Sequence, residues 1–310
     1  MRVLVTGAAG FVGKALVDRM IRQNGYEIRA VVRRRPGVAS RDVDLVVAEI
    51  DGMTDWKHPL AGVNAVVHLA ARAHVMRDAA EHPLDEYRRV NVAGTLNLGR
   101  QAAAHQVRRF VYLSSVKVHG ESGTYRESDV PSPEDAYGLS KHEAEVGLRR
   151  IAADTGMEVV IIRPPLVYGP GARANFGTLV RAVAAGLPLP LAAVRNRRSL
   201  IGLDNLVDFI LVCLAHPAAA NETFLVSDGE DLSTTDLVRR LARAMGRPDR
   251  LFPVPPSLLM SAAIIVGKRD VARRLLGTLC VDSSKARRQL AWTPPVSVDE
   301  GLKRAVRGRV

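Results

Sequence analysis

Short apolar runs alternate with segments of helical periodicity through the first half of the chain. The runs are rich in β-branched residues, which favour strands, and turn residues bound them. They predict strands over residues 2–6, 28–32, 45–48, 65–69, 110–114 and 159–163. Between the runs, the apolar spacing predicts helices over residues 11–23, 85–104 and 137–155. This alternation is typical of an α/β fold with a parallel sheet covered on both faces, so we expect a doubly wound Rossmann sheet.

The pattern changes after residue 165. Prolines gather, loops lengthen and strands become rare, although residues 223–226 still have the pattern of a strand. We therefore expect a dinucleotide-binding domain over residues 1–165 and a smaller substrate-binding domain over residues 166–310. The chain is expected to return to the main sheet near residues 200–226.

One segment, residues 257–266, is apolar on every side of a predicted helix. The apolar run here is far shorter than the roughly 20 residues that span a bilayer. We expect a buried helix, and docking on a membrane surface or on a partner is the alternative. No secretory signal pattern opens the chain, so we expect a cytoplasmic protein without membrane insertion.

Composition and charge narrow the possible functions. The 310 residues are 47% hydrophobic and 25% charged, which is typical of a globular protein. The 44 Lys and Arg residues against 32 Asp and Glu residues give a net charge of +12, which suits an anionic partner. The basic residues are scattered and aromatic residues are only 5%, so we do not expect nucleic-acid binding. Two cysteines and no carboxylate–histidine cluster predict neither a disulfide framework nor a metal site.

A glycine-rich loop lies where the first predicted strand turns into the first predicted helix. Its three glycines have the spacing that allows a tight turn and a close approach to a pyrophosphate. The N-terminus of the helix then offers free N–H groups to the phosphates. The cofactor-binding residues predicted in this loop are Gly7, Ala9, Gly10, Phe11, Val12 and Gly13.

The second predicted strand ends in three arginines, Arg33, Arg34 and Arg35, rather than in an acidic residue. An Asp or Glu at this point would accept a hydrogen bond from the ribose 2′-hydroxyl of NAD, whereas a guanidinium group binds a 2′-phosphate. Arg33 and Arg34 therefore favour NADP(H), and NAD(H) is the alternative.

Tyr137 and Lys141 lie four residues apart at the start of a predicted helix and so share one face of it. A cation near a phenol favours the phenolate, which would make Tyr137 a usable acid and base near neutral pH. Ser115 follows the fifth predicted strand and is expected to hydrogen-bond the same substrate oxygen.

Together these motifs resemble the extended short-chain dehydrogenase/reductases, and among them the NAD-dependent epimerase/dehydratase family of nucleotide-sugar enzymes. The resemblance covers nearly the whole chain and also rests on residues 66–71, 90–95, 113–115, 163–164, 168–170, 282–286 and 290–294. It implies that Ser115, Tyr137 and Lys141 are catalytic, with Tyr137 moving the proton of a sugar hydroxyl or ketone. It also implies a homodimer formed by the helices that begin near Asp85 and Tyr137.

The same resemblance implies further binding residues. For the cofactor these are Glu49, Ile50, Leu69, Ala70, Ala71, Asn91 and Pro164, together with Tyr137 and with Lys141 on the nicotinamide ribose. For a UDP-sugar they are Asn175 and Arg198, the latter on the nucleotide diphosphate. We add His74, Ser115 and Lys117 as candidate substrate contacts.

The residues after Ser115 narrow the reaction. Dehydratases of the family carry an Asp-Glu pair there, whereas Val116 and Lys117 offer no carboxylate acid or base, so we do not expect a 4,6-dehydratase. Arg33 and Arg34 favour a reductase that consumes NADPH. Residues 115–120 and 196–208 resemble a subgroup of the family that reduces UDP-4-keto-6-deoxy-N-acetylhexosamines in surface-polysaccharide synthesis, and we predict this reaction. The alternatives are a UDP-glucose or UDP-N-acetylglucosamine 4-epimerase and a non-catalytic NADP-binding regulator with the same fold.

Overall fold

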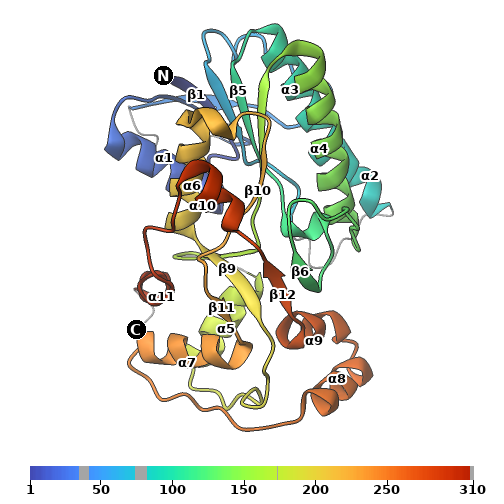
Figure 1. The fold of residues 1–310 in the computed structure, drawn as a ribbon, viewed down its shortest axis with the longest axis vertical. Helices are drawn as coiled ribbons and strands as arrows, with labels where there is room; N and C mark the ends of the chain where they lie inside the picture. The colour runs from blue at the N-terminus through green and yellow to red at the C-terminus, as the bar shows by residue number, and fades with distance from the viewer. Residues whose placement is uncertain (35–41, 74–81, 173, 308–310) are drawn as a thin grey trace.

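A computed structural model describes residues 1–34, 42–73, 82–172 and 174–307 of the chain. Figure 1 shows a large α/β layer at the top and a smaller domain below it. The main sheet has seven parallel strands in the order β10-β7-β5-β4-β1-β2-β3. They are β1 (Arg2–Thr6), β2 (Glu27–Val32), β3 (Val43–Val47), β4 (Ala65–His68), β5 (Arg109–Leu113), β7 (Glu158–Arg163) and β10 (Thr223–Leu225).

Helices cover both faces of this sheet, because its central strands are apolar on both sides. One face carries α1 (Phe11–Gln23), α6 (Leu203–Ala215) and α10 (Ser284–Leu290), and Leu16, Phe209 and Trp292 lie in the core beneath them. The other face carries α2 (Pro83–Tyr87), α3 (Thr95–Ala104) and α4 (Ala136–Thr155), with Leu98 and Leu148 in their core. The predicted doubly wound Rossmann sheet is confirmed.

The prediction that strands become rare after residue 165 is wrong. In the described part of the chain, five short strands follow that residue: β8 (Leu166–Tyr168), β9 (Arg198–Gly202), β10, β11 (Asp231–Leu232) and β12 (Leu279–Val281). Four of them, β8, β9, β11 and β12, form a second sheet with β6 (Gly123–Tyr125). The order of its strands is β11-β9-β12-β6, and β8 pairs with β9. Strands of two to five residues are too short for an alternating pattern to reveal them.

The smaller domain is built from this second sheet and from α5 (Ala174–Ala184), α7 (Thr234–Ala244), α8 (Pro256–Ile265), α9 (Arg269–Leu276) and α11 (Val298–Val306). Phe176, Leu241 and Leu302 are among its buried core residues. The chain passes between the two domains several times, since α6, β10 and α10 lie beyond residue 165 and pack on the main sheet. No helix in the described residues is long and apolar enough to cross a membrane.

Candidate active site

The glycine loop joins β1 to α1, and neither Gly7 nor Gly13 leaves space for a side chain. Gly7 has a φ of +67°, and a Cβ there would lie 2.8 Å from the backbone nitrogen of Ala70. At Gly13, a Cβ would lie 2.1 Å from the carbonyl oxygen of Gly7. Among the described residues no side chain caps α1, so its first N–H groups and its partial positive charge are available to a phosphate. The loop therefore fits the pyrophosphate of a dinucleotide.

The segment after β4, which contains the predicted cofactor contacts Leu69, Ala70 and Ala71, lies directly beside this loop. The Thr6 hydroxyl accepts a hydrogen bond from the Ala70 nitrogen at 3.2 Å and lies 2.6 Å from Nδ1 of His68. Burial lowers the pKa of His68 to about 3, so this histidine is neutral. His68 therefore ties the end of β4 to the end of β1, where the glycine loop begins.

Two further predicted cofactor sites lie at the ends of β2 and β3. Arg33 and Arg34 are exposed where β2 ends, and Arg35 lies outside the described residues. Ile50 is buried, and its side chain closes the space beside Gly94, where a Cβ would approach Ile50 Cγ2 to 2.8 Å. Glu49 is exposed. The choice between NADP and NAD stays a prediction that depends on the arginines.

Ser115, Tyr137 and Lys141 come together at the carboxyl end of β5. The side chain of Ser115 lies close enough to the phenol of Tyr137 to favour its phenolate and so to lower its pKa, against the effect of burial. Nζ of Lys141 lies 6.0 Å from the centre of the Tyr137 ring and donates a hydrogen bond to the carbonyl oxygen of Leu113 at 2.8 Å. The structure thus joins the three predicted residues in one cluster.

The first turn of α4 is held against the loop that carries Ser115. Asp135 caps the helix by accepting a hydrogen bond from the Gly138 nitrogen at 2.6 Å, and its carboxylate also pairs with Lys117. A Cβ at Gly138 would lie 2.5 Å from the carbonyl oxygen of Lys117. Glycine at this position therefore allows the close contact that brings Tyr137 to Ser115.

Burial controls the electrostatics of this cluster. It raises the pKa of Tyr137 above its ordinary value, and the nearby Asp135 adds to the effect. It lowers the pKa of Lys141 to about 7, against the attraction of Glu145. The sequence-based expectation of a phenol with a lowered pKa is therefore wrong for this arrangement, because desolvation outweighs the effect of Ser115.

The predicted helix over residues 85–104 contains a π-helical turn, η1 (Arg88–Gly94), which the sequence pattern did not reveal. Such turns are frequent at functional sites. Here η1 holds Asn91, whose Nδ2 donates to Oγ of Ser140 at 2.9 Å and to the carbonyl oxygen of Arg72 at 3.1 Å. Asn91 therefore ties the segment after β4 to the catalytic helix α4.

The predicted substrate contacts lie on both domains. Nζ of Lys117 pairs with Glu121 at 2.5 Å, and Arg198 at the start of β9 donates to the carbonyl oxygen of Gly277 at 3.1 Å. Burial lowers the pKa of Arg198, and the charge of Glu121 opposes this shift. Asn175 is half-buried in the first turn of α5, and His74 lies outside the described residues.

Pro164, a predicted cofactor contact, lies beside the loop that carries Ser115. Its carbonyl oxygen accepts a hydrogen bond from the Val116 nitrogen at 3.0 Å.

Arg274 on α9 is a further cationic group at this site. Its Nη2 lies 3.8 Å from Oε1 of Glu121, and its Nε is buried without a hydrogen-bond partner among the described residues. Lys117 and Arg274 therefore both pair with the carboxylate of Glu121, whose charge also acts on Arg198, and this cluster suits an anionic ligand. Nothing in the sequence pattern separates Arg274 from the other helical arginines; only the packing of α9 reveals it. In the described ranges, no group of three or more His, Cys, Asp or Glu residues could hold a metal ion.

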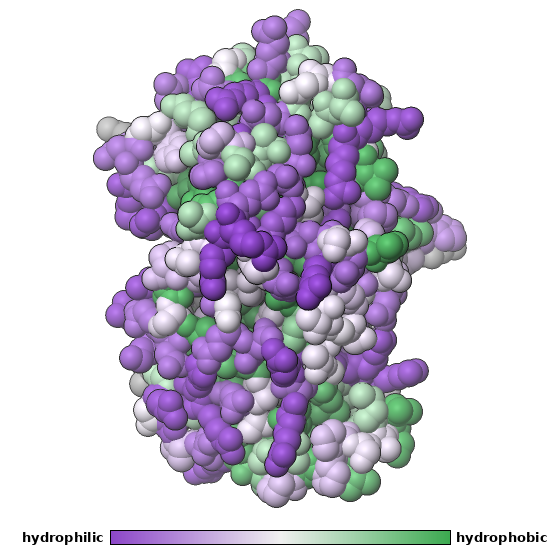
Figure 2. All heavy atoms as spheres, viewed as in Figure 1, coloured by the Kyte–Doolittle hydropathy of each residue, from purple (hydrophilic) through white to green (hydrophobic). Residues whose placement is uncertain are grey.

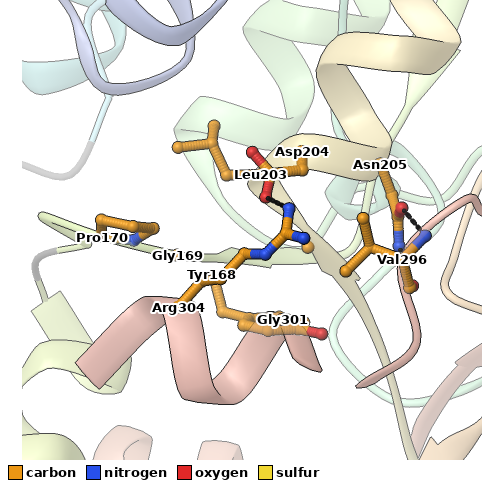
Figure 3. Close-up of a pocket in the computed structure, with 10 residues that line it drawn as sticks. Tyr168, Gly169, Pro170, Leu203, Asp204, Asn205, Val296, Gly301 and Arg304 are labelled. Carbon is orange, nitrogen blue, oxygen red and sulfur yellow. Dashed lines mark hydrogen bonds and ion pairs between the residues drawn. The ribbon is translucent and has the colours of Figure 1, made fainter. Parts of the chain in front are cut away.

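Other residues that carry the family resemblance hold the fold together. Figure 3 shows residues 168–170 with Asp204 and Asn205 in a small pocket that contains none of the three catalytic candidates. Asp204 pairs with Arg304 of α11 at 2.8 Å, and Nδ2 of Asn205 donates to the carbonyl oxygen of Val296 at 2.8 Å. These contacts attach the C-terminal segment to the start of α6.

Comparison with known proteins agrees with this geometry. The model of the NAD dependent epimerase/dehydratase family matches residues 3–227. A UDP-glucose 4-epimerase of Vibrio cholerae is 47% identical over 309 residues, which cover 97% of this chain and 93% of that protein. The structure of MoeE5 with UDP-glucuronic acid and NAD is 27% identical, with a TM-score of 0.79 and coverage of 99% of this chain and 98% of that chain.

A dTDP-glucose 4,6-dehydratase, DesIV from Streptomyces venezuelae with NAD bound, is 28% identical with a TM-score of 0.79, and the match covers 99% of this chain and 96% of that chain. Structures of dehydratases and of UDP-sugar-binding proteins therefore share this fold. With the match over residues 3–227 and the Vibrio cholerae relative, the chain belongs to the NAD-dependent epimerase/dehydratase family of extended short-chain dehydrogenase/reductases.

Proposed function

We propose that this enzyme is a UDP-hexose 4-epimerase that acts on UDP-glucose or on UDP-N-acetylglucosamine. The likeness to the Vibrio cholerae UDP-glucose 4-epimerase over 97% of the chain carries the proposal. The pairing of Ser115 with Tyr137 supports it, because C4 chemistry needs a proton carrier at the sugar hydroxyl. The 4-ketoreductase predicted from the sequence is the second candidate, and Arg33 and Arg34 favour it.

The residues of the site divide the reaction between them. A nicotinamide cofactor supplies reversible acceptance of the hydride from C4 of the sugar. Tyr137 would accept the proton of the C4 hydroxyl in its phenolate form, which burial disfavours and the positive charge of Lys141 would favour, and would return the proton after the 4-keto sugar has rotated in the site. Ser115 hydrogen-bonds the same oxygen, and Lys141 supplies positive charge beneath the phenol. Since hydride and proton both return, the sugar is inverted at C4 without net oxidation.

The diphosphate of the substrate is proposed to bind between the two domains. Arg198 and Arg274 come from the smaller domain and Lys117 from the Rossmann domain, and Glu121 lies among them. A diphosphate would compete with Glu121 for the same cations, since both are anionic acceptors. On this proposal the Rossmann domain binds the dinucleotide and the smaller domain binds the sugar nucleotide.

Dehydration is not part of the proposal, despite the likeness to DesIV. Elimination of water needs a carboxylic acid and a base close to the sugar. Val116 is buried beside Ser115, and the carboxylates of Glu121 and Asp135 both pair with Lys117. These two carboxylates are therefore held as ion-pair partners rather than as free acids.

The test uses the purified protein with UDP-glucose and, separately, with UDP-N-acetylglucosamine, and follows the C4 epimers by proton NMR. We expect interconversion without net change in nicotinamide absorbance. Stoichiometric loss of NADPH absorbance with a UDP-4-keto-6-deoxy-N-acetylhexosamine, without epimer formation, would establish the reductase instead. Tyr137→Phe is the control for turnover at this site.

Two further expectations accompany the proposal. The nucleotide released on denaturation is expected to carry a 2′-phosphate if Arg33 and Arg34 bind it, and phosphate analysis separates NADP from NAD. A homodimer through α2 and α4 is expected from the family resemblance, and light scattering measures its mass.

A further inference from the structure

The helix α8 is apolar but exposed. The sequence pattern predicted a buried helix over residues 257–266, and this prediction is wrong because no residue of α8 is buried. Leu258 is 61% exposed and Ile265 is 84% exposed. A helix that is apolar on every side is normally enclosed by protein or by lipid. The exposure of α8 therefore needs an explanation that the proposed reaction does not provide.

The exposed apolar side chains concentrate around this helix. Twelve large hydrophobic side chains are exposed in the described residues, and six of them fall within residues 252–271. Figure 2 shows a green, apolar group at the lower right, where Figure 1 places α8. Contiguous apolar surface of this kind marks interaction sites. We call it the α8 surface, and it consists of Phe252, Leu258, Ile264, Ile265, Val266 and Val271.

The α8 surface is held firmly on the molecule. Leu259 packs against the core of the smaller domain on the inner side of the helix. The neighbouring helix α9 packs on α8 and is tied to the Rossmann domain by the pairs Arg273–Glu134 at 2.9 Å and Arg274–Glu121 at 3.8 Å. Because Glu121 also pairs with Lys117, α9 lies between the α8 surface and the proposed diphosphate site.

Positive charge flanks the apolar side chains. Lys268 lies in the short connection after α8, and Arg269 is the first residue of α9; both are exposed and make no side-chain hydrogen bond or ion pair with any described residue. Asp270 is the single acidic residue beside them, and the whole chain has a net charge of +12. Cations next to exposed aliphatic side chains complement a surface that offers acyl chains below a layer of phosphate groups.

The chemistry of the patch favours lipid over a protein partner. Energetically dominant residues of protein interfaces are enriched in Trp, Tyr and Arg. The α8 surface has one aromatic side chain, Phe252, and no Trp or Tyr, and the α8 helix itself, residues 256–265, holds only aliphatic residues, one Met, two Ser and one Pro. Its length of 10 residues is also too short to span a bilayer, so the helix can lie only along the surface.

We propose that the α8 surface docks the protein on a bilayer that contains anionic phospholipid. The helix lies in the plane of the interface, with Leu258 and Ile265 among the acyl chains and with Lys268 and Arg269 at the phosphate groups. This orientation places α9, and the diphosphate site behind it, close to the membrane. The proposal rests on the exposure and charge of α8 and not on the reaction.

The test measures sedimentation of the full-length protein with vesicles of phosphatidylcholine, with and without phosphatidylglycerol. We expect the protein to sediment with the anionic vesicles and to remain largely in solution with phosphatidylcholine alone. Leu258→Asp with Ile265→Asp should abolish sedimentation. Lys268→Glu with Arg269→Glu should lower the partition coefficient by roughly tenfold or more, because each cation near an anionic surface contributes about a fivefold effect.

Met53→Asp is the matched control, since Met53 is 92% exposed on the Rossmann domain, and it should sediment like the wild type. All variants should keep the melting temperature and the turnover of soluble UDP-sugar, so that a folding defect is recognised. The proposal is overturned if the wild type stays in solution with anionic vesicles, or if the α8 variants still sediment. It is also overturned if Ile265→Asp instead dissociates a dimer, since the surface would then bind a second copy. Sedimentation needs no turnover, so its failure is separate from failure of the epimerase proposal.

Discussion

Helices α4 and α8 both depart from the usual relation between polarity and burial: α4 buries charged side chains, and α8 exposes apolar ones. On α4, the charged residues Lys141 and Glu145 are 2% and 0% exposed, whereas on α8 the aliphatic Ile265 is 84% exposed. Polar groups are expensive to bury and apolar groups are expensive to expose, so each departure needs a compensating function. The comparison indicates that α4 is arranged for chemistry and α8 for contact with something outside the chain.

The buried charges of α4 are compensated by partners. Glu145 accepts a hydrogen bond from the Ser114 hydroxyl at 2.5 Å and pairs with the guanidinium of Arg163, which is 1% exposed. Nη1 of Arg163 lies 2.8 Å from Nε2 of His119, whose pKa burial lowers to about 4, so that the neutral ring accepts this hydrogen bond. This network fixes the strand end that carries Ser115. By contrast, no side-chain hydrogen bond or ion pair holds α8 within the described part of the chain, and the helix is retained by the packing of Leu259 and of α9.

The largest expected effect comes from removing the proton carrier on α4. Tyr137→Phe should lower kcat by about 10²–10⁴-fold, the usual contribution of a positioned acid and base. Steady-state epimerisation of the UDP-sugar measures it, with protein-bound nucleotide as the check that the cofactor site is intact. Tyr87→Phe is the control, because the Tyr87 ring packs edge-on against Tyr137 at 6.2 Å and its hydroxyl is not needed for the chemistry. Turnover of Tyr137→Phe near the wild-type rate would remove this residue from the mechanism.

Breaking the buried ion pair should have the next largest effect. Glu145→Gln leaves the Arg163 guanidinium buried without its counter-charge, which should lower the free energy of unfolding by about 3–5 kcal/mol. Urea denaturation measures the change. Glu27→Gln breaks the exposed pair with Arg2, which is 2.7 Å long, and should cost at most about 1 kcal/mol. Equal losses in the two variants would contradict the view that the α4 network is structurally dominant.

A pH-dependent effect should follow from the buried Lys141. Its pKa is about 7 in the folded protein against an ordinary 10.5, so between these values the unfolded chain binds more protons than the folded protein. The stability of the wild type should therefore rise with pH through this window, relative to Lys141→Met. Urea unfolding of both proteins, with matched nucleotide content, measures the difference.

Lys57→Met, which removes an exposed lysine, is the control for the general loss of a positive charge. A difference between wild type and Lys141→Met that stays flat from about pH 7 to about pH 10 would show that burial does not hold the lysine pKa down.

The same contrast shows where sequence reasoning succeeds. The Rossmann strands are predicted well because each is a continuous apolar run, and the glycine loop and the Tyr137–Lys141 spacing are local patterns that need no tertiary information. Arg274 is not predictable in this way, because its place beside Glu121 depends on how α9 packs against a loop 153 positions earlier in the chain. The π-helical turn at Asn91 is also missed, since its residues have ordinary helical spacing.

The burial of α8 is the clearest failure, and its cause is physical. Apolar periodicity reports that a segment avoids water, but it does not report whether protein or lipid replaces the water. The sequence therefore predicts the helix correctly and assigns it the wrong surroundings. Only the positions of the other elements show that nothing among the described residues covers its outer side.

The smallest expected effect is on stability in solution, and it separates the two sides of α8. Ile265→Asp should change the free energy of unfolding by no more than about 0.5 kcal/mol, because an exposed side chain loses no packing. Leu259→Asp should cost more, about 1–3 kcal/mol, since Leu259 packs against the core of the smaller domain. Thermal and urea unfolding without lipid measure both variants. Equal destabilisation would mean that protein already covers the outer side of α8 in solution, so that no free surface would remain for lipid.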